Sequence, residues 1–224
     1  MKFIEYADAD MMAIDVANIM AGELENTLFH EERVSFAVPG GETPGPVFDN
    51  LCAVDLDWSR VDVFLTDERW LPEDHPRSNT RFLRQRLLTD KAAAAVYHPL
   101  YIPAEKPEDV LAELESSLVS CQPISVLLLG MGADMHCASL LPGAEGLVDA
   151  LAVDAPLLVP IRSPDAAETR VTLSARVLDS AVSKHLVITG RRKRDALERG
   201  MHLPPDEAPI AAVMDGLTVH WAPE

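Results

Sequence analysis

The chain has 224 residues, of which 48% are hydrophobic and 25% charged, and its formal net charge is −17 at pH 7. This composition is typical of a folded α/β domain and not of a disordered chain. The acidic excess argues against a nucleic-acid partner, because a phosphate backbone is bound by clustered lysines and arginines. A small anionic ligand remains compatible with it, since a few focused cations can hold one phosphate.

The sequence predicts neither a membrane span nor a signal peptide. No stretch approaches the roughly 20 unbroken apolar residues that cross a bilayer, and acidic residues interrupt the N-terminal segment. The cysteines, Cys52, Cys121 and Cys137, are too widely spaced for a disulfide framework or a CxxC metal pair. We therefore expect a cytoplasmic protein without a membrane partner.

The seven histidines are scattered along the chain, without an HExxH pattern or a Cys/His quartet. Four of them have no neighbour in the sequence that would suit a shared site: His98, His185, His202 and His220. We therefore expect no required metal.

Apolar spacing predicts helices that alternate with strands along the chain. The expected helices cover residues 8–29, 46–51, 79–88, 108–120 and 191–200, and the last of them ends at Gly200. The expected strands cover residues 33–38, 61–66, 124–130, 157–161, 185–190, 210–214 and 217–221. This alternation predicts a mostly parallel sheet covered on both faces, with the last two strands as an antiparallel edge pair. Without a repeat or a linker, residues 1–224 are expected to form one domain.

Three of the predicted strands end in residues that suit a binding site. Residues 40–44 follow the first strand, residues 66–69 end the second, and residues 130–136 end the third. The carboxyl ends of parallel strands meet at one edge of a sheet, where ligands bind in open α/β folds. We therefore expect these three segments to lie together.

The segment "VPGGETP" has the composition of a phosphate-binding turn. Gly40 and Gly41 allow a tight turn with exposed N–H groups, and Pro44 suits the first helical position with Thr43 as N-cap. A helix N-terminus of this kind holds anions. An ordinary strand-to-helix turn is the alternative, and the absence of a Walker or GxGxxG pattern means that no nucleotide is implied.

The segment "TDERWLP" places Asp67, Glu68 and Arg69 at a strand end. Arg69 can pair with a neighbouring carboxylate or hold a substrate anion through its planar fork of donors. A salt-bridged loop arginine is the structural alternative. Further along, Ser78 is expected to cap the helix that begins there.

Two later segments, "ETRVTLS" and "ITGRRKRDAL", supply further cations, Arg170 and Lys193. Lys193 falls in the first turn of its predicted helix, which is unfavourable for a cation unless an anion joins it. The neighbouring arginines 191, 192 and 194 are more typical of a solvated face.

The segment "LLLGMGADMHCASLLPG" ends a buried strand with Asp134 and His136. Histidine is the side chain best suited to general-base work near neutral pH, and a nearby carboxylate can orient its ring. Two residues apart, the pair can converge on a loop but not on a helix. The alternative is a structural histidine. Cys137 has no oriented base beside it, so core packing is the better interpretation of this thiol.

Taken in order, six segments resemble the 6-phosphogluconolactonases of the pentose phosphate pathway, which are relatives of the glucosamine-6-phosphate deaminases. These segments are "PGGETP", "LTDERWLPEDHPRSN", "LLLGMGADMHCASLLPG", "RVTLS", "ITGRRK" and "VHWAPE". The resemblance implies a Rossmann-like three-layer α/β sandwich with a mostly parallel, CoA-transferase-like sheet. It also implies hydrolysis of 6-phospho-D-glucono-1,5-lactone to 6-phospho-D-gluconate, without a cofactor or a metal.

By this resemblance, His136 is the general base that activates water and Asp134 is its polar partner. The resemblance further implies a substrate site formed by Gly40, Gly41, Thr43, Asp67, Arg69, Arg170 and Lys193. The small-molecule substrate is the only partner expected, and the protein is expected to be a monomer or a weak homodimer.

Two alternatives remain open. The deaminases carry a pattern that resembles DEY after the second strand, where this chain has Arg69 as the third residue. They also carry a glutamate shortly after the histidine, where this chain has Leu141. A sugar-phosphate binder with weakened catalysis is the other alternative, because Met135 stands where lactonases usually have glycine. Cys137 and Pro39 also depart from the usual threonine and serine. If the glycine has a positive φ, a side chain there costs roughly 1 kcal/mol and could narrow the site.

Overall fold

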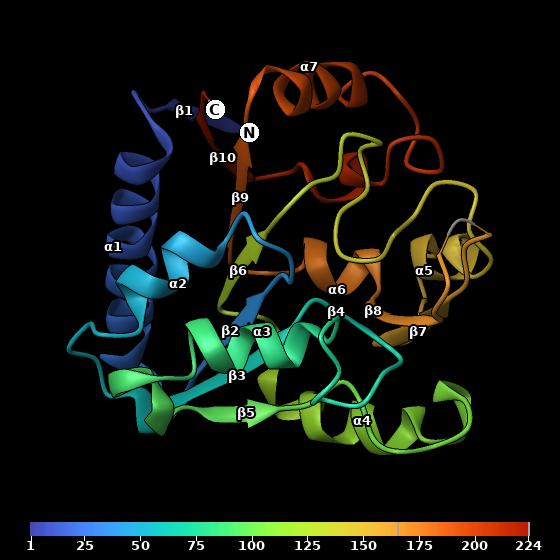
Figure 1. The fold of residues 1–224 in the computed structure, drawn as a ribbon, viewed down its shortest axis with the longest axis horizontal. Coiled ribbons are helices and arrows are strands. Elements are labelled where there is room, and N and C mark those ends of the chain that lie inside the picture. The colour runs from blue at the N-terminus through green and yellow to red at the C-terminus, as the bar shows by residue number, and fades with distance from the viewer. Residues whose placement is uncertain (165, 224) are drawn as a thin grey trace.

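The computed structural model describes residues 1–164 and 166–223, and its centre is a seven-stranded sheet. The strand order is β1-β10-β9-β6-β2-β3-β5, and all neighbouring strands run parallel (Figure 1). Its strands are β1 (Lys2–Glu5), β2 (Val34–Val38), β3 (Val61–Leu65), β5 (Val96–His98), β6 (Val126–Leu129), β9 (Ser183–Thr189) and β10 (Thr218–Ala222). The predicted α/β class with a mostly parallel sheet is confirmed.

Helices lie on both sides of this sheet, α1 and α2 on one side and α6 and α7 on the other (Figure 1). The helices are α1 (Ala9–Leu28), α2 (Gly45–Leu51), α3 (Asn79–Arg86), α4 (Leu111–Leu118), α5 (Leu147–Leu151), α6 (Ala175–Asp179) and α7 (Arg191–Gly200). Short 3-10 turns join them: η1 (Trp58–Arg60), η2 (Asp90–Ala94), η3 (Pro107–Asp109), η4 (Val119–Cys121) and η5 (Pro209–Val213). Within the described part of the chain, no helix combines the length and the apolar character that crossing a membrane requires.

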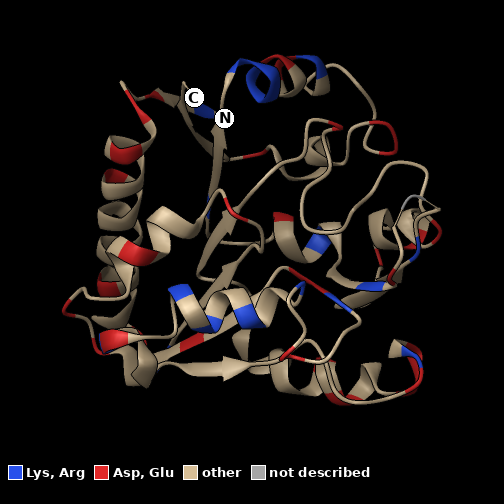
Figure 2. Ribbon diagram, viewed as in Figure 1, with Lys and Arg blue, Asp and Glu red and all other residues tan. Residues whose placement is uncertain are grey.

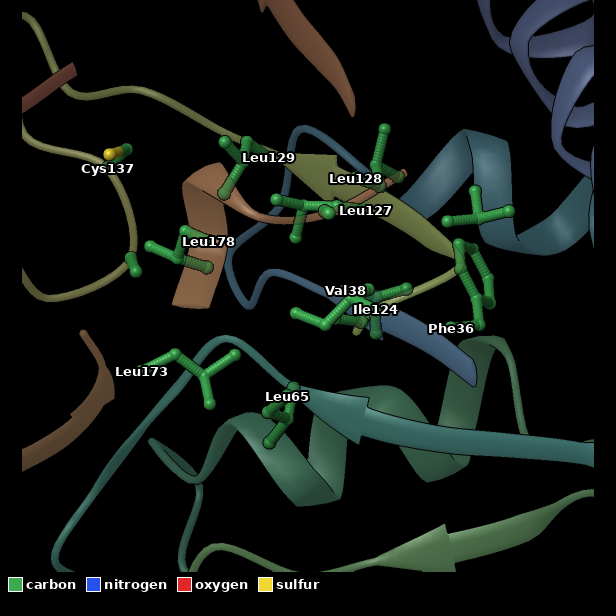
Figure 3. Packing of buried hydrophobic residues seen from close by; sticks show 14 of the residues in the cluster. Phe36, Val38, Leu65, Ile124, Leu127, Leu128, Leu129, Cys137, Leu173 and Leu178 are labelled. Atoms are coloured by element: carbon green, nitrogen blue, oxygen red, sulfur yellow. The ribbon is translucent and has the colours of Figure 1, made fainter. Parts of the chain in front are cut away.

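The core is built from strands that are apolar on both faces, because helices cover both sides of the sheet. Every residue of β2, β3 and β6 is buried. Figure 3 shows Leu127, Leu128 and Leu129 of β6 packed near side chains of the neighbouring strands and of α6. Cys137 belongs to the same cluster and is fully buried. Burial raises the pKa of this thiol to about 12, so Cys137 packs in the core as expected.

A second, smaller sheet was not predicted. It consists of β4 (Asp67–Arg69), β8 (Arg170–Leu173) and β7 (Leu158–Ile161), paired antiparallel in the order β4-β8-β7. The expected strand at residues 157–161 therefore exists, but it lies outside the central sheet. Nothing in the local sequence distinguishes the two sheets, because strand pairing is decided by contacts between distant segments.

The predicted C-terminal arrangement is wrong in two respects. Residues 210–214 were expected to form a strand, but Pro209–Val213 form the turn η5. The expected antiparallel edge pair is also absent, because β10 pairs parallel with both β9 and β1. A short apolar run cannot be assigned to a strand or a helical turn by periodicity alone. The edge strand β1 was missed because it is only half-buried.

Candidate active site

The loops that follow β2, β3 and β6 surround a cavity of about 290 Å³ at the carboxyl edge of the sheet. Side chains from the start of β8 and from α7 complete its wall. Most of the residues singled out in the sequence line this cavity: Gly40, Gly41, Thr43, Asp67, Arg69, His136, Arg170 and Lys193. Asp134 is not on the wall but contacts His136 behind it. The volume is at the lower end of the range for small-molecule sites, which suits one sugar phosphate.

His136 and Asp134 form a close pair on the loop after β6. Nδ1 of His136 lies 2.6 Å from Oδ1 of Asp134. Because a charged carboxylate can only accept, the Nδ1–H group donates this hydrogen bond, and Nε2 of the neutral ring carries the lone pair. The hydrogen bond from His136 lowers the pKa of Asp134 below its ordinary value. The carboxylate is therefore charged at neutral pH, and it stabilises the ring when Nε2 takes up a proton.

Gly132 makes this pairing possible. A Cβ atom at this position would lie 2.3 Å from Oδ1 of Asp134 and 2.4 Å from Cε1 of His136, which is too close for any side chain. Two backbone hydrogen bonds close the loop. The Gly132 N–H donates to the His136 carbonyl, and the Met135 N–H donates to the Gly132 carbonyl, both at 3.0 Å. The second glycine of "GMG" is thus required by the histidine–aspartate pair.

Met135 adopts the positive φ that glycine usually supplies, at 68°. Its side chain points away from the cavity: the sulfur lies 3.2 Å from where a Cβ on Gly200 of α7 would be, and Met135 does not line the cavity wall. Its carbonyl accepts from the Ile210 N–H at 3.1 Å. The expectation that this side chain could narrow the site is therefore wrong, although the backbone strain at Met135 is present.

The loop after β2 differs in one detail from its prediction. The helix α2 begins at Gly45, between the expected first position at Pro44 and the start of the apolar pattern at residue 46, and its N-cap is Pro44 and not Thr43, without a side-chain capping bond. Gly41 has a φ of 86°. A Cβ at Gly40 would lie 2.2 Å from the Asn79 side chain, so glycine is required for the close approach of this loop to α3. Thr43 remains on the cavity wall.

Arg69 and Arg170 stand directly opposite each other, because they form a cross-strand pair between β4 and β8. Both line the cavity. Burial, together with the neighbouring positive charges of Arg69 and Arg77, lowers the pKa of Arg170, and the Asp67 carboxylate opposes this shift. Like charges opposite each other in a sheet destabilise it. An anion bound between the two guanidinium groups would therefore reduce the repulsion between Arg69 and Arg170.

Asp67 balances only part of this positive charge. Its Oδ2 lies 3.7 Å from Nη1 of Arg170 and accepts a hydrogen bond from the Ser139 hydroxyl at 2.5 Å. Asp67 is almost fully buried, so its carboxylate is held in place and is not free to rotate toward Arg69.

Asn79 was missed by the sequence analysis, although it lines the cavity and is buried. Its Oδ1 accepts from Nη1 of Arg69 at 2.8 Å, and its Nδ2 donates to the Asp67 carbonyl at 2.9 Å. It therefore fixes the guanidinium of Arg69 to the strand end. The position just after Ser78, at the start of the helix, was the available signal.

Glu68 has a structural role, apart from the cavity wall. Its carboxylate accepts the backbone N–H groups of Asn79 and Thr80, at 2.8 and 2.7 Å, so it caps the N-terminus of α3. Burial raises the pKa of Glu68, even though these hydrogen bonds favour the charged form. Ser78 caps the same helix by accepting from the Arg81 N–H at 3.2 Å, as predicted.

Lys193 is a half-buried cation in the first turn of α7, a helix that carries several basic residues (Figure 2). Among the described residues it has no hydrogen-bond or ion-pair partner, and burial lowers its pKa. A cation without a counter-ion at a helix N-terminus is destabilised by the positive end of the helix dipole and by the loss of solvent. An anion in the cavity would offset both.

Three histidines have partners that the sequence did not reveal. His98 bonds Asp62 at 2.8 Å, and His185 lies 3.0 Å from His220, ring nitrogen to ring nitrogen. The expectation that these histidines lack partners is wrong for all three. The Asp62–His98 and His185–His220 contacts join residues more than 30 positions apart, beyond the reach of local spacing, although the ring of His185 also bonds the nearby Ser183 hydroxyl at 2.9 Å.

The parallel sheet and the cavity at its carboxyl edge define an α/β protein of the class that binds small ligands at that edge. The sequence profile of a family described as glucosamine-6-phosphate isomerases/6-phosphogluconolactonase matches residues 7–221. The chain therefore belongs to this family.

Relatives along almost the full length carry one name. A 6-phosphogluconolactonase of Mesorhizobium japonicum is 36% identical over 227 aligned positions, covering 97% of this chain and 94% of the relative. One of Pseudomonas aeruginosa is 35% identical, covering 97% and 93%.

The fold agrees with solved structures of both branches of the family. The crystal structure of a 6-phosphogluconolactonase from Shewanella baltica superposes with a TM-score of 0.94 at 28% identity, covering 99% of this chain and 97% of the other. A monomeric glucosamine-6-phosphate deaminase superposes with a TM-score of 0.80 at 17% identity, covering 99% and 97%. The second likeness shows a shared fold alone.

Proposed function

We propose that the chain is a 6-phosphogluconolactonase, which hydrolyses 6-phospho-D-glucono-1,5-lactone to 6-phospho-D-gluconate. The observation that carries the proposal is the placement of the His136–Asp134 pair on the same cavity as three cations, Arg69, Arg170 and Lys193. The names of relatives about 35% identical over nearly the full chain support the same activity.

The chemistry needs one base and one water molecule. Nε2 of His136 takes a proton from water while the water oxygen attacks the carbonyl carbon of the lactone. The carbonyl oxygen becomes an oxyanion, and the resulting imidazolium is stabilised by the charged Asp134. When the oxyanion collapses, the bond to the ring oxygen breaks and that oxygen takes the proton from His136. The products are a carboxylic acid, which ionises, and a free hydroxyl, with the base restored.

The phosphate group is held at the cationic part of the cavity. It carries between one and two negative charges at neutral pH, and Arg69, Arg170 and Lys193 supply three positive ones. Binding relieves the repulsion between the two cross-strand arginines and gives Lys193 a partner. The loop Gly40–Gly41 brings backbone close to the same space, which is the usual reason for glycines beside a bound phosphate.

The deaminase alternative rests on the shared fold alone, since Arg69 and Leu141 stand where that branch has its own polar residues. The binder alternative depended on Met135 weakening catalysis through backbone strain or a narrowed pocket. The positive φ is present, but the Met135 side chain does not line the cavity. Neither alternative is favoured by an observation of the cavity.

The direct experiment follows freshly generated lactone against an enzyme-free control, because the lactone also opens without a catalyst. Hydrolysis well above the spontaneous rate supports the lactonase. Ammonia release from glucosamine-6-phosphate would support a deaminase instead. Tight binding of 6-phospho-D-gluconate without any acceleration of lactone opening would indicate a binder, and would contradict the proposal.

We further propose that residues 1–224 act as one catalytic domain in the cytoplasm, as a monomer or a weak homodimer. The three free cysteines, all buried, support a reducing compartment. Size-exclusion chromatography with light scattering tests the oligomeric state.

A further inference from the structure

A second cavity, of about 410 Å³, lies at the amino edge of the sheet, opposite the candidate active site. Its wall is formed by the end of α1, the start of β2, the start of β3 and the segment around η4. Most of its lining is polar, and it includes Glu31, Arg33, Asp62, Cys121 and Gln122. Nothing in the proposed lactonase reaction uses this cavity.

Three side chains with metal-binding atoms meet beside this cavity, and two of them, Asp62 and Cys121, line its wall. Asp62 comes from β3, His98 from the adjacent strand β5, and Cys121 from η4. Nε2 of His98 lies 2.8 Å from Oδ1 of Asp62 and 3.9 Å from Sγ of Cys121. One donor atom from each residue fits within a span of 4.8 Å. Strands β3 and β5 lie side by side at the lower edge of the sheet in Figure 1.

We propose that Asp62, His98 and Cys121 form a zinc-binding site whose fourth position opens to the amino-edge cavity. A thiolate, an imidazole and a carboxylate are the three ligand types that Zn²⁺ takes in proteins. In a tetrahedral zinc site such donor atoms lie roughly 3.3–3.6 Å apart. The observed nitrogen–oxygen distance is shorter and the nitrogen–sulfur distance longer, so an ion between the three requires the Cys121 side chain to move inward and the His98–Asp62 hydrogen bond to open.

Binding the ion replaces a proton. Zn²⁺ forms a bond to Sγ as the S–H bond of Cys121 breaks, and that proton leaves to solvent. The ring of His98 binds through Nε2 and keeps its own proton on Nδ1, and Asp62 binds through Oδ1. Because the metal displaces the thiol proton, zinc uptake at this site is expected to weaken at low pH.

Arg33 both supports and opposes the ion. Its Nε donates to Oδ2 of Asp62 at 2.7 Å and its Nη2 to Oδ1 at 2.9 Å, so the carboxylate is held in one orientation. Outer hydrogen bonds of this kind orient metal ligands. The guanidinium charge repels a cation, but the Arg33 side chain is 45% exposed, so water screens this repulsion. Only the bond to Oδ1 has to be shared with the metal.

The cavity also offers a donor for whatever occupies the fourth position. Nε2 of Gln122 is buried and lacks an acceptor among the described residues, and Gln122 lines the same wall. An unpaired buried donor costs free energy, and a water or hydroxide on the ion is an oxygen acceptor placed in this cavity. The Glu31 carboxylate on the wall adds negative charge near a site that would be net positive when filled.

The test is zinc content after equilibrium dialysis against micromolar ZnCl₂, measured by elemental analysis on four folded proteins. These are the wild type, Cys121→Ser, His98→Gln and the matched control Cys52→Ser, which removes another buried free thiol. The proposal predicts that Cys121→Ser and His98→Gln each lose one zinc per chain and that Cys52→Ser loses none. Zinc held by His136 and Asp134 would be present in all four and cancels in the comparison. Equal zinc contents, or no zinc in any of them, would overturn the site.

A measurement on the wild type alone guards against variants that fail to fold. Titration with Co²⁺ is expected to produce a thiolate-to-cobalt charge-transfer band in the near ultraviolet, which added Zn²⁺ abolishes. Absence of the band would contradict a thiolate ligand. This outcome is independent of lactone hydrolysis, so failure of the zinc site and failure of the proposed function are distinguishable.

Discussion

Two histidine–aspartate pairs lie at opposite edges of one sheet in the described part of the chain, and their surroundings differ. At the carboxyl edge, His136 bonds Asp134 through Nδ1, and the ring lies on a cavity with three cations. At the amino edge, His98 bonds Asp62 through Nε2, and Arg33 occupies both oxygens of the same carboxylate. The first pair leaves its second ring nitrogen available to a substrate. The second is already neutralised by its neighbours.

The difference teaches that a histidine–aspartate contact does not by itself identify a catalyst. What separates the two pairs is the state of the charges around them. Lys193 has no partner among the described residues, whereas Arg33 donates hydrogen bonds to both oxygens of the Asp62 carboxylate. The unbalanced positive charge at the carboxyl edge indicates an anionic ligand there, whereas the Asp62–His98 pair, already hydrogen-bonded to Arg33, is not a candidate base for the reaction.

The largest expected effect is at the carboxyl-edge histidine. His136→Ala removes the base, and we expect kcat for lactone hydrolysis to fall by about 10²- to 10⁴-fold. The exposed His30 provides the matched control, because His30→Ala removes an imidazole far from the cavity. Initial rates corrected for spontaneous opening measure both. A kcat for His136→Ala within twofold of the wild type would remove His136 from the mechanism.

The next effect is on substrate binding. Lys193→Met keeps most of the side-chain volume but removes the unpaired charge, and we expect KM to rise roughly 10- to 100-fold while kcat changes little. Arg191→Met, on the exposed face of the same helix, is the control. If both variants behave alike, the charge of Lys193 does not face the phosphate.

Asp134→Asn tests the polar partner of the base. Without the negative charge, the imidazolium that forms during the reaction is less stable, so we expect kcat to fall roughly 10-fold. Initial rates corrected for spontaneous opening measure this change. An unchanged kcat would mean that Asp134 only orients the loop.

Asp62→Asn should act on stability and not on the reaction. Burial alone would raise the pKa of Asp62, but the hydrogen bonds from Arg33 and His98 lower it below its ordinary value. A lowered folded pKa contributes stability that is present above the unfolded pKa and is lost as the pH falls through the folded pKa. In metal-free protein we expect a loss of about 1–2 kcal/mol at pH 7 and a smaller loss below about pH 4.

Urea denaturation at the two pH values measures this difference. The matched variant is Asp134→Asn. The pKa of Asp134 is also lowered, but its side chain is 57% exposed against 12% for Asp62, so water screens the interaction and we expect a smaller loss of unfolding free energy. Equal losses in both variants, or a loss for Asp62→Asn that does not shrink in acid, would contradict the comparison of the two pairs.

The smallest effect is expected for Met135→Gly. Glycine relieves the positive φ, a gain of roughly 1 kcal/mol, and loses the packing of the side chain against α7. The two contributions oppose each other, so we expect the melting temperature to change by only a few degrees and kcat to stay within about twofold. A large gain in kcat would mean that Met135 restricts the site after all.

Much of the fold and the site was readable from local sequence. Buried runs such as residues 124–130 predicted central strands, and the glycines and polar residues after them predicted the edge where the cavity lies. The cross-strand contact of Arg69 with Arg170 was not readable, because it arises from a small antiparallel sheet between segments a hundred residues apart.

Two missed features share one physical cause. The pairing of the edge strand β1 and the partner of His98 depend on contacts between residues that are far apart in sequence. Asn79 differs, since its contacts with Arg69 and Asp67 span only 10 and 12 residues, across the turn between β4 and α3. The error at residues 210–214 has another cause, since a short apolar run suits a strand and a 3-10 turn equally well.

The most direct test is to measure by calorimetry how 6-phospho-D-gluconate binds to His136→Ala and to Lys193→Met. It asks whether one residue acts as the base while another binds the phosphate of the same molecule. We predict a Kd for His136→Ala within about threefold of the wild type, and a Kd for Lys193→Met weaker by roughly tenfold or more. The reverse order, with the histidine variant losing affinity and the lysine variant keeping it, would contradict the proposed division of work within the cavity.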